Sequence, residues 1–124
     1  MNTTEAVRVL IVDDDSLVRQ MLAQMLRAHL DIEVVGQAAT GDEALSSVER
    51  LQPNVVIMDI RMPKMDGIAA TREIKVRYPD IKVIGLTEYA DGYNGDALKR
   101  AGAIEVYHKS QAPEELYHAI KRFS

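Results

Sequence analysis

Five short apolar runs alternate with amphipathic stretches along almost the whole chain, and this alternation constrains the fold most. The first run, residues 7–12, is β-branched and continuously apolar, as a strand covered on both faces requires. Residues 16–30 then place apolar side chains at spacings of three and four, which is typical of an amphipathic helix. The members of this stripe are Leu17, Val18, Met21, Leu22, Met25 and Leu26.

The same alternation continues to the end of the sequence. The further predicted strands are residues 32–35, 55–58, 81–86 and 104–108. The further predicted helices are residues 41–51, a helix that Asp66 caps and that runs through Tyr78, a weaker helix between Asp91 and Ala101, and residues 113–123. Gly92 and Gly95 each cost about 1 kcal/mol relative to alanine, so we expect the weaker helix to be mobile. Because parallel strands need crossover connections, the pattern predicts an α/β fold with a five-stranded parallel sheet covered by helices on both faces.

Length and composition predict one soluble domain over residues 1–124, of which 47% are hydrophobic and 27% charged. The absence of cysteine excludes disulfides and thiolate chemistry and fits a cytoplasmic location. Fifteen basic against 19 acidic residues give a net charge of -4, which argues against direct nucleic-acid binding. No run approaches the roughly 20 apolar residues of a membrane span. The first six residues also lack the features of a secretion signal.

Polar residues stand where four of the five predicted strands end. In a parallel sheet with helices on both faces, these ends meet at one edge, and ligands bind there. Three carboxylates at one place repel each other unless a cation neutralises them, and all-oxygen ligation favours Mg²⁺. A hydroxyl and an ammonium facing that cation suit an anion, which we interpret as a phosphoryl group. The residues are Asp13, Asp14 and Asp15 after the first strand, Asp59 after the third, Thr87 after the fourth and Lys109 after the fifth.

Each of these residues also has an ordinary interpretation. We interpret Asp15 as the cap of the first helix, because a carboxylate there accepts hydrogen bonds from free backbone N–H groups. Thr87 and Lys109 would each be unremarkable alone, and only their joint placement at one edge indicates a site. His29, His108 and His118 have no metal-ligand spacing, and we expect all three to be surface histidines.

Residues 58–67, Met-Asp-Ile-Arg-Met-Pro-Lys-Met-Asp-Gly, together with the other strand-end residues, resemble the response-regulator receiver family over essentially the whole chain. The resemblance implies that Asp59 accepts a phosphoryl group and that Asp13, Asp14, Asp59 and the backbone carbonyl of Arg61 hold Mg²⁺. Thr87 and Lys109 match the switch threonine and the phosphate-binding lysine. The implied fold is flavodoxin-like, a three-layer (βα)5 sandwich with strand order 2-1-3-4-5.

The resemblance also implies partners. A sensor histidine kinase would supply the phosphoryl group, and the domain would be a monomer or a phosphorylation-dependent homodimer. Ser110 follows Lys109, as in receivers that precede a LuxR/NarL-type helix-turn-helix domain, so a DNA-binding output domain beyond Ser124 or a partner protein would control transcription. Tyr93 and Tyr117, on the fourth and fifth helices, are candidate partner contacts.

Two departures from the family pattern leave alternatives open. Glu88 follows Thr87 where the family usually has a small residue, so its charge would lie near an incoming phosphoryl group. Val106 stands where the family has an aromatic switch, and Tyr107 should point to the other face of the strand. A degenerate receiver that works through protein contacts without phosphate is therefore an alternative. A Mg²⁺-dependent phosphohydrolase is less favoured, because Arg61 stands where a second acid would act.

Overall fold

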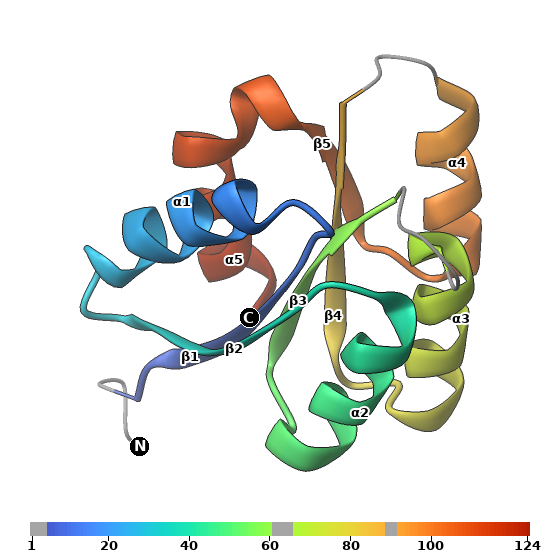
Figure 1. The fold of residues 1–124 in the computed structure, drawn as a ribbon, viewed down its shortest axis with the longest axis horizontal. Coiled ribbons are helices and arrows are strands. Elements are labelled where there is room, and N and C mark those ends of the chain that lie inside the picture. Colours follow the sequence, from blue (N-terminus) through green and yellow to red (C-terminus); the bar gives the residue numbers. More distant parts are fainter. Residues whose placement is uncertain (1–4, 61–65, 89–91) are drawn as a thin grey trace.

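A computed structural model describes residues 5–60, 66–88 and 92–124. Strands and helices alternate along the chain in the expected way (Figure 1). The strands are β1 (Val7–Val12), β2 (Ile32–Ala38), β3 (Val55–Asp59), β4 (Lys82–Thr87) and β5 (Glu105–His108). The helices are α1 (Ser16–Arg27), α2 (Gly41–Leu51), α3 (Gly67–Arg77), α4 (Gly92–Ala101) and α5 (Ala112–Phe123), with a 3-10 turn at Lys109–Gln111 before α5.

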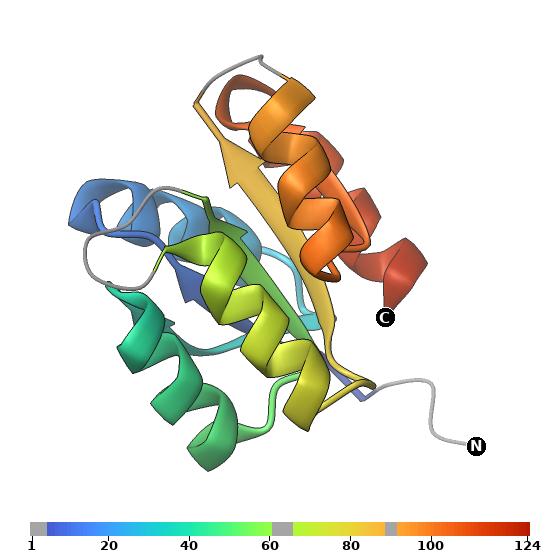
Figure 2. The same cartoon turned by 90° about the vertical axis from the view of Figure 1, so that its right-hand side faces the viewer.

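The five strands form one parallel sheet in the order β2-β1-β3-β4-β5, which confirms the predicted flavodoxin-like topology. Helices α1 and α5 pack on one face of this sheet, and α2, α3 and α4 pack on the other (Figures 1 and 2). The chain moves outward from β1 to β2 and then returns to β3 on the other side of β1. The strand order therefore reverses between β1 and β3, which is where ligands bind in sheets of this kind.

The continuous apolar character of β1 follows from this three-layer arrangement. Val9 and Ile11 belong to the core cluster under α1 and α5, whereas Leu10 and Val12 belong to the cluster under α2, α3 and α4. Successive residues of a strand point to opposite faces, so a strand covered on both sides needs an apolar residue at every position. In β5 the same rule sends Tyr107 to the first cluster and Val106 to the second, as expected.

Several predicted ends were wrong by a few residues. Helix α1 stops at Arg27 rather than at Leu30, which is 99% exposed. Strand β2 continues to Ala38 because, after a shift in register, β1 goes on pairing with it through Gly36, a residue with little strand preference of its own. The other ends coincide with the predicted ones or differ from them by a single residue, as is usual where a strand or helix frays. The fourth helix is present, and its mobility stays a prediction.

The inner face predicted for α1 was partly wrong. Leu22, Ala23 and Leu26 are buried against the sheet, whereas Leu17 is 73% and Met21 57% exposed. Consecutive helical residues are about 100° apart around the axis, so Leu17 and Met21 are turned away from the buried direction that Leu22 defines. The apolar stripe of this helix is wider than the surface that it packs against.

Leucine-to-alanine changes at the two faces of α1 test this assignment. Leu26→Ala should lower the free energy of unfolding by about 2–5 kcal/mol, because it leaves a cavity under α1. Leu17→Ala should change it by less than about 0.5 kcal/mol, because the side chain already meets solvent. Urea unfolding followed by circular dichroism measures both. Equal losses for the two variants would contradict the assignment.

Candidate functional site

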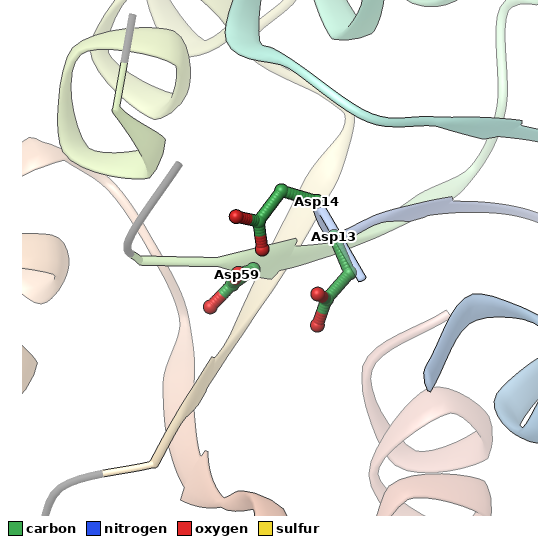
Figure 3. A group of neighbouring side chains, drawn as sticks. All are labelled: Asp13, Asp14 and Asp59. Carbon is green, nitrogen blue, oxygen red and sulfur yellow. The ribbon is translucent and has the colours of Figure 1, made fainter. Parts of the chain in front are cut away.

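Three carboxylates meet at the carboxyl ends of β1 and β3, as predicted. Asp13, Asp14 and Asp59 each offer an oxygen, and these oxygens lie within 4.8 Å of one another. Figure 3 shows the side chains leaving the end of β1 and the end of β3 beside each other. Asp13 is 1% and Asp59 4% exposed, whereas Asp14 faces solvent. The cluster therefore has two buried acids and one accessible acid.

The register of the sheet explains why these acids are neighbours. Val12 at the end of β1 lies opposite Met58 of β3, so Asp13, which follows β1, and Asp59, the last residue of β3, lie at the same level. Asp13 is fixed further, because its Oδ1 accepts a hydrogen bond from the backbone N–H of Asp15 at 2.9 Å and its carbonyl oxygen accepts one from Arg19 Nη1 at 2.7 Å. The turn after β1 thus holds one carboxylate in place.

Lys109 supplies the positive charge that the buried acids require. Its Nζ lies 2.8 Å from Asp13 Oδ2, 3.5 Å from Asp59 Oδ1 and 3.5 Å from Glu88 Oε1. An isolated buried carboxylate is costly, and a paired one much less so. Lys109 therefore points from the end of β5, across the ends of β4 and β3, into the acid cluster.

The surroundings of Lys109 keep it protonated. Burial by itself would lower the pKa of Lys109, but the hydrogen bond with Asp13 and the charges of Asp59, Asp13 and Glu88 outweigh it, so the pKa lies above the ordinary 10.5. Because the pKa of Lys109 is higher in the folded state than in the unfolded state, its charge contributes its full stabilisation at every pH below the unfolded-state pKa. This contribution is lost only as the pH rises through the raised value, above about 10.5.

Thr87 and Glu88 lie at the end of β4. Thr87 is the last residue of that strand, 8% exposed, and pairs in register with His108 of β5. Glu88 has a side chain that is 64% exposed, yet its carboxylate reaches Lys109. Glu88 thus shares Lys109 with Asp13 and Asp59, and the expectation that its charge would lie near an incoming phosphoryl group stays a prediction.

Asp15 is the helix cap that we expected. Its Oδ1 accepts hydrogen bonds from the backbone N–H groups of Leu17 at 2.9 Å and Val18 at 3.4 Å. This contact stabilises the start of α1 and aims the carboxylate at the helix. Of the three consecutive acids, only Asp13 and Asp14 belong to the cluster.

Gly67 allows the start of α3 to pack closely against the backbone of Asp59. It is the first residue of α3, after the cap Asp66, and its N–H donates a hydrogen bond to the carbonyl oxygen of Ile60 at 2.9 Å. A Cβ atom at this position would overlap the carbonyl group of Asp59. The glycine therefore lets the start of α3 lie directly against the end of β3.

The histidines lie at the surface, as we expected, although His29 and His108 are only partly exposed and contact other residues. His108 is partly buried, with its Nε2 2.9 Å from the carbonyl oxygen of Glu88. His29 stacks on Tyr117, with ring centroids 3.7 Å apart, and Tyr117 in turn donates a hydrogen bond to Asp31 at 2.7 Å. Tyr117 thus has contacts within its own chain. These contacts join segments far apart in the sequence, so spacing alone could not reveal them.

Two expectations lie outside the described part of the chain. The backbone carbonyl of Arg61 was predicted to hold a metal ion, and residues 61–65 are not among the described ones. The side chain of Tyr93 is not described either. Within the described ranges, no helix combines the length and the apolar character that crossing a membrane requires.

Comparison with known proteins agrees with this geometry. Residues 9–121 match the response regulator receiver domain family. The chain therefore belongs to the family of response regulator receiver domains of two-component signalling.

The similar proteins include transcriptional regulators. The chain is 42% identical over 110 residues to the uncharacterized transcriptional regulatory protein YhcZ of Bacillus subtilis, covering 89% of this chain and 51% of that protein. It is 39% identical to the response regulator GacA of Pseudomonas viridiflava, covering 93% of this chain and 54% of GacA. The chain thus spans about half the length of these relatives.

Solved structures show the same fold. A LuxR-family response regulator from Aurantimonas superimposes with a TM-score of 0.89 at 29% identity, covering 95% of this chain and 84% of that one. A LuxR-family DNA-binding response regulator from Staphylococcus aureus superimposes with a TM-score of 0.88 at 29% identity, covering 94% of this chain and 98% of that one. The resemblance to LuxR/NarL-type receivers is confirmed.

Glycine-to-alanine changes in two helices test the role of Gly67. Gly67→Ala should lower the free energy of unfolding by about 1–3 kcal/mol, because its methyl group would push the backbone of Asp59 aside. Gly95→Ala should raise it by up to about 1 kcal/mol, because a Cβ there makes only an ordinary contact with Val106 and alanine favours the helix. Urea unfolding measures both changes. A neutral Gly67→Ala would contradict the close packing of α3 on β3.

Proposed function

We propose that this domain accepts a phosphoryl group on Asp59 from a sensor histidine kinase, with Mg²⁺ held by Asp13, Asp14, Asp59 and the backbone carbonyl of Arg61. The observation that carries the proposal is the cluster of three carboxylate oxygens within 4.8 Å of one another, with the ammonium of Lys109 against it. Family membership supports the same role for these residues.

The donor set fits Mg²⁺. The cluster consists of carboxylates alone, the oxygen ligands that hard cations prefer. The three oxygens lie within 4.8 Å of one another, so they could hold one small divalent cation together. Asp14 is exposed, so its side chain is free to adjust. When bound, Mg²⁺ would neutralise the carboxylates and the oxygens of the phosphoryl group.

The residues of the chain perform the transfer. A carboxylate oxygen of Asp59 attacks phosphorus and forms the new O–P bond, while the P–N bond to the kinase imidazole breaks and the imidazole keeps the electron pair. The ammonium of Lys109 and the hydroxyl of Thr87 donate hydrogen bonds to the phosphoryl oxygens. The product on Asp59 is an acyl phosphate with about −1.5 to −2 charge, which attracts Thr87 and reorganises the segment after it.

Residues 1–124 would then be the receiver domain of a longer regulator. The relatives are about twice as long, and two of them carry the word transcriptional in their names. We propose that a DNA-binding output domain, or a partner protein, receives the signal and controls transcription, and that the receiver itself does not bind nucleic acid because its net charge is -4. The protein would act in the cytoplasm, as a monomer or as a phosphorylation-dependent homodimer.

A phosphate-independent interaction module is the second candidate. The contact between Glu88 and Lys109 favours it, because a carboxylate of the chain already pairs with the ammonium that a phosphoryl group would need. A Mg²⁺-dependent phosphohydrolase is less favoured, since Arg61 is not an acid. A phosphorylation experiment distinguishes the phosphoacceptor, the interaction module and the phosphohydrolase.

Intact-protein mass spectrometry after incubation with acetyl phosphate and Mg²⁺ tests the main proposal. The unchanged chain should gain one phosphoryl group, and Asp59→Asn should gain none, because the amide is a poor nucleophile. Asp15→Asn is the matched control: asparagine caps a helix as well as aspartate does, so this variant should still be phosphorylated. An adduct that persists in Asp59→Asn would contradict the assignment. Sustained release of phosphate over many turnovers would indicate the hydrolase, and no adduct together with no beryllofluoride binding would indicate the interaction module.

Removing one ligand tests the metal site. Asp14→Asn should weaken Mg²⁺ binding at least about tenfold, because a neutral amide replaces an accessible carboxylate. Isothermal titration calorimetry measures the affinity. Mg²⁺ should also raise the midpoint of thermal unfolding in the unchanged chain and in Asp15→Asn, and much less in Asp14→Asn. Equal Mg²⁺ affinities for Asp14→Asn and Asp15→Asn would contradict the proposed ligand set.

A further inference from the structure

Glu88 is held at two points, one on its side chain and one on its backbone. Its Oε1 lies 3.5 Å from Lys109 Nζ, and its carbonyl oxygen lies 2.9 Å from His108 Nε2. Glu88 directly follows Thr87, and His108 directly precedes Lys109. The one residue after β4, Glu88, is thus tied to two consecutive residues at the end of β5, His108 and Lys109.

The contacts of the imidazole define which nitrogen carries the proton. The backbone N–H of Ser110 donates a hydrogen bond to His108 Nδ1 at 3.0 Å, and Ser110 Oγ lies 2.7 Å from the same nitrogen. Nδ1 must therefore be the acceptor. The neutral ring then carries its proton on Nε2, which donates to the carbonyl oxygen of Glu88. Ser110 thus orients the ring, and the ring holds the backbone of Glu88.

The side chain of Glu88 competes for the ammonium of the site. Lys109 is shared by the buried carboxylates of Asp13 and Asp59 and by the exposed carboxylate of Glu88. A phosphoryl group arriving at Asp59 needs the same ammonium and carries charge of the same sign as Glu88. Glu88 therefore opposes its arrival twice, by occupying Lys109 and by repelling the incoming anion.

We propose that Glu88 is a built-in competitor for Lys109 that slows phosphoryl uptake at Asp59, and that His108 is the positioning residue that holds Glu88 there. This inference rests on the proposed phosphorylation of Asp59 and adds a determinant of its rate. Removing the carboxylate of Glu88 should speed phosphoryl uptake at Asp59. Removing the His108 contact with the Glu88 backbone should also speed it, but only while the carboxylate of Glu88 is present.

The experiment is a double-mutant cycle on the initial rate of phosphorylation by acetyl phosphate and Mg²⁺, followed by intact-protein mass spectrometry. Glu88→Gln should react about fivefold faster, the effect of about one unit-charge interaction at close range in a watery environment. His108→Ala should also react faster in the unchanged background. In the Glu88→Gln background it should add nothing, because its effect passes through the carboxylate of Glu88.

Four controls separate this role from a structural one. Glu33→Gln removes an exposed carboxylate from β2, at the opposite edge of the sheet from β5, and should leave the rate unchanged. The advantage of Glu88→Gln should shrink as salt is added, since screening weakens an exposed charge. Thermal unfolding shows that each variant is folded, and NMR of the imidazole nitrogens should find the proton of His108 on Nε2.

Each outcome has a defined meaning. Faster uptake in Glu88→Gln with no further gain from His108→Ala supports the inference, as does an adduct that forms in Glu88→Gln but not in the unchanged chain. Equal rates for the unchanged chain and Glu88→Gln, additive effects in the cycle, or a proton on Nδ1 of His108 overturn it and leave the phosphorylation of Asp59 standing. The absence of an adduct in every variant overturns both proposals.

Discussion

The pairing of the Lys109 ammonium with the Asp13 carboxylate, 2.8 Å apart, is the contact on which the arrangement of the site depends. Asp13 is almost fully buried, and removing the partner of a buried charge costs about 3–5 kcal/mol in proteins generally. The same ammonium also lies 3.5 Å from Asp59, so it joins the end of β5 to the ends of β1 and β3 across the top of β4. Because its pKa is raised, this positive charge persists throughout the neutral range.

The topology of the sheet makes this pairing possible. With the order β2-β1-β3-β4-β5, the turn after β1 and the end of β3 are adjacent at the place where the strand order reverses. The two core clusters pack against the strands on both faces, so the backbone at the strand ends is held in place. The close fit of Gly67 against the carbonyl group of Asp59 also fixes the backbone of Asp59 at the end of β3. The site is therefore preorganised by apolar packing that lies beneath it.

The sequence was sufficient to predict the fold and most of the candidate site. Apolar runs and helical spacing depend on local properties of the chain, and the strand-end rule converts them into a common position for Asp13, Asp59 and Lys109. The exposure of Leu17 could not be predicted, because it depends on how much of the α1 surface the sheet and α5 cover. The contact between His108 and Glu88 could not be predicted either, because it joins residues 20 positions apart whose side chains have no distinctive spacing.

Lys109 links the ends of β1 and β3 to the ends of β4 and β5. Asp13 and Asp59 lie together at the ends of β1 and β3, and His108 at the end of β5 contacts the backbone of Glu88 after β4. Lys109 contacts both acids and the side chain of Glu88. An anion that draws the ammonium toward Asp59 must therefore weaken its contact with Glu88, the residue from which the chain continues toward α4. The aromatic residue of β5 is not placed to take part, because Tyr107 packs under α1 and α5 while Val106 faces α4. If Asp59 is phosphorylated as proposed, the coupling to the surface around α4 would therefore be electrostatic, through Lys109 and Glu88, rather than a rotation of an aromatic side chain.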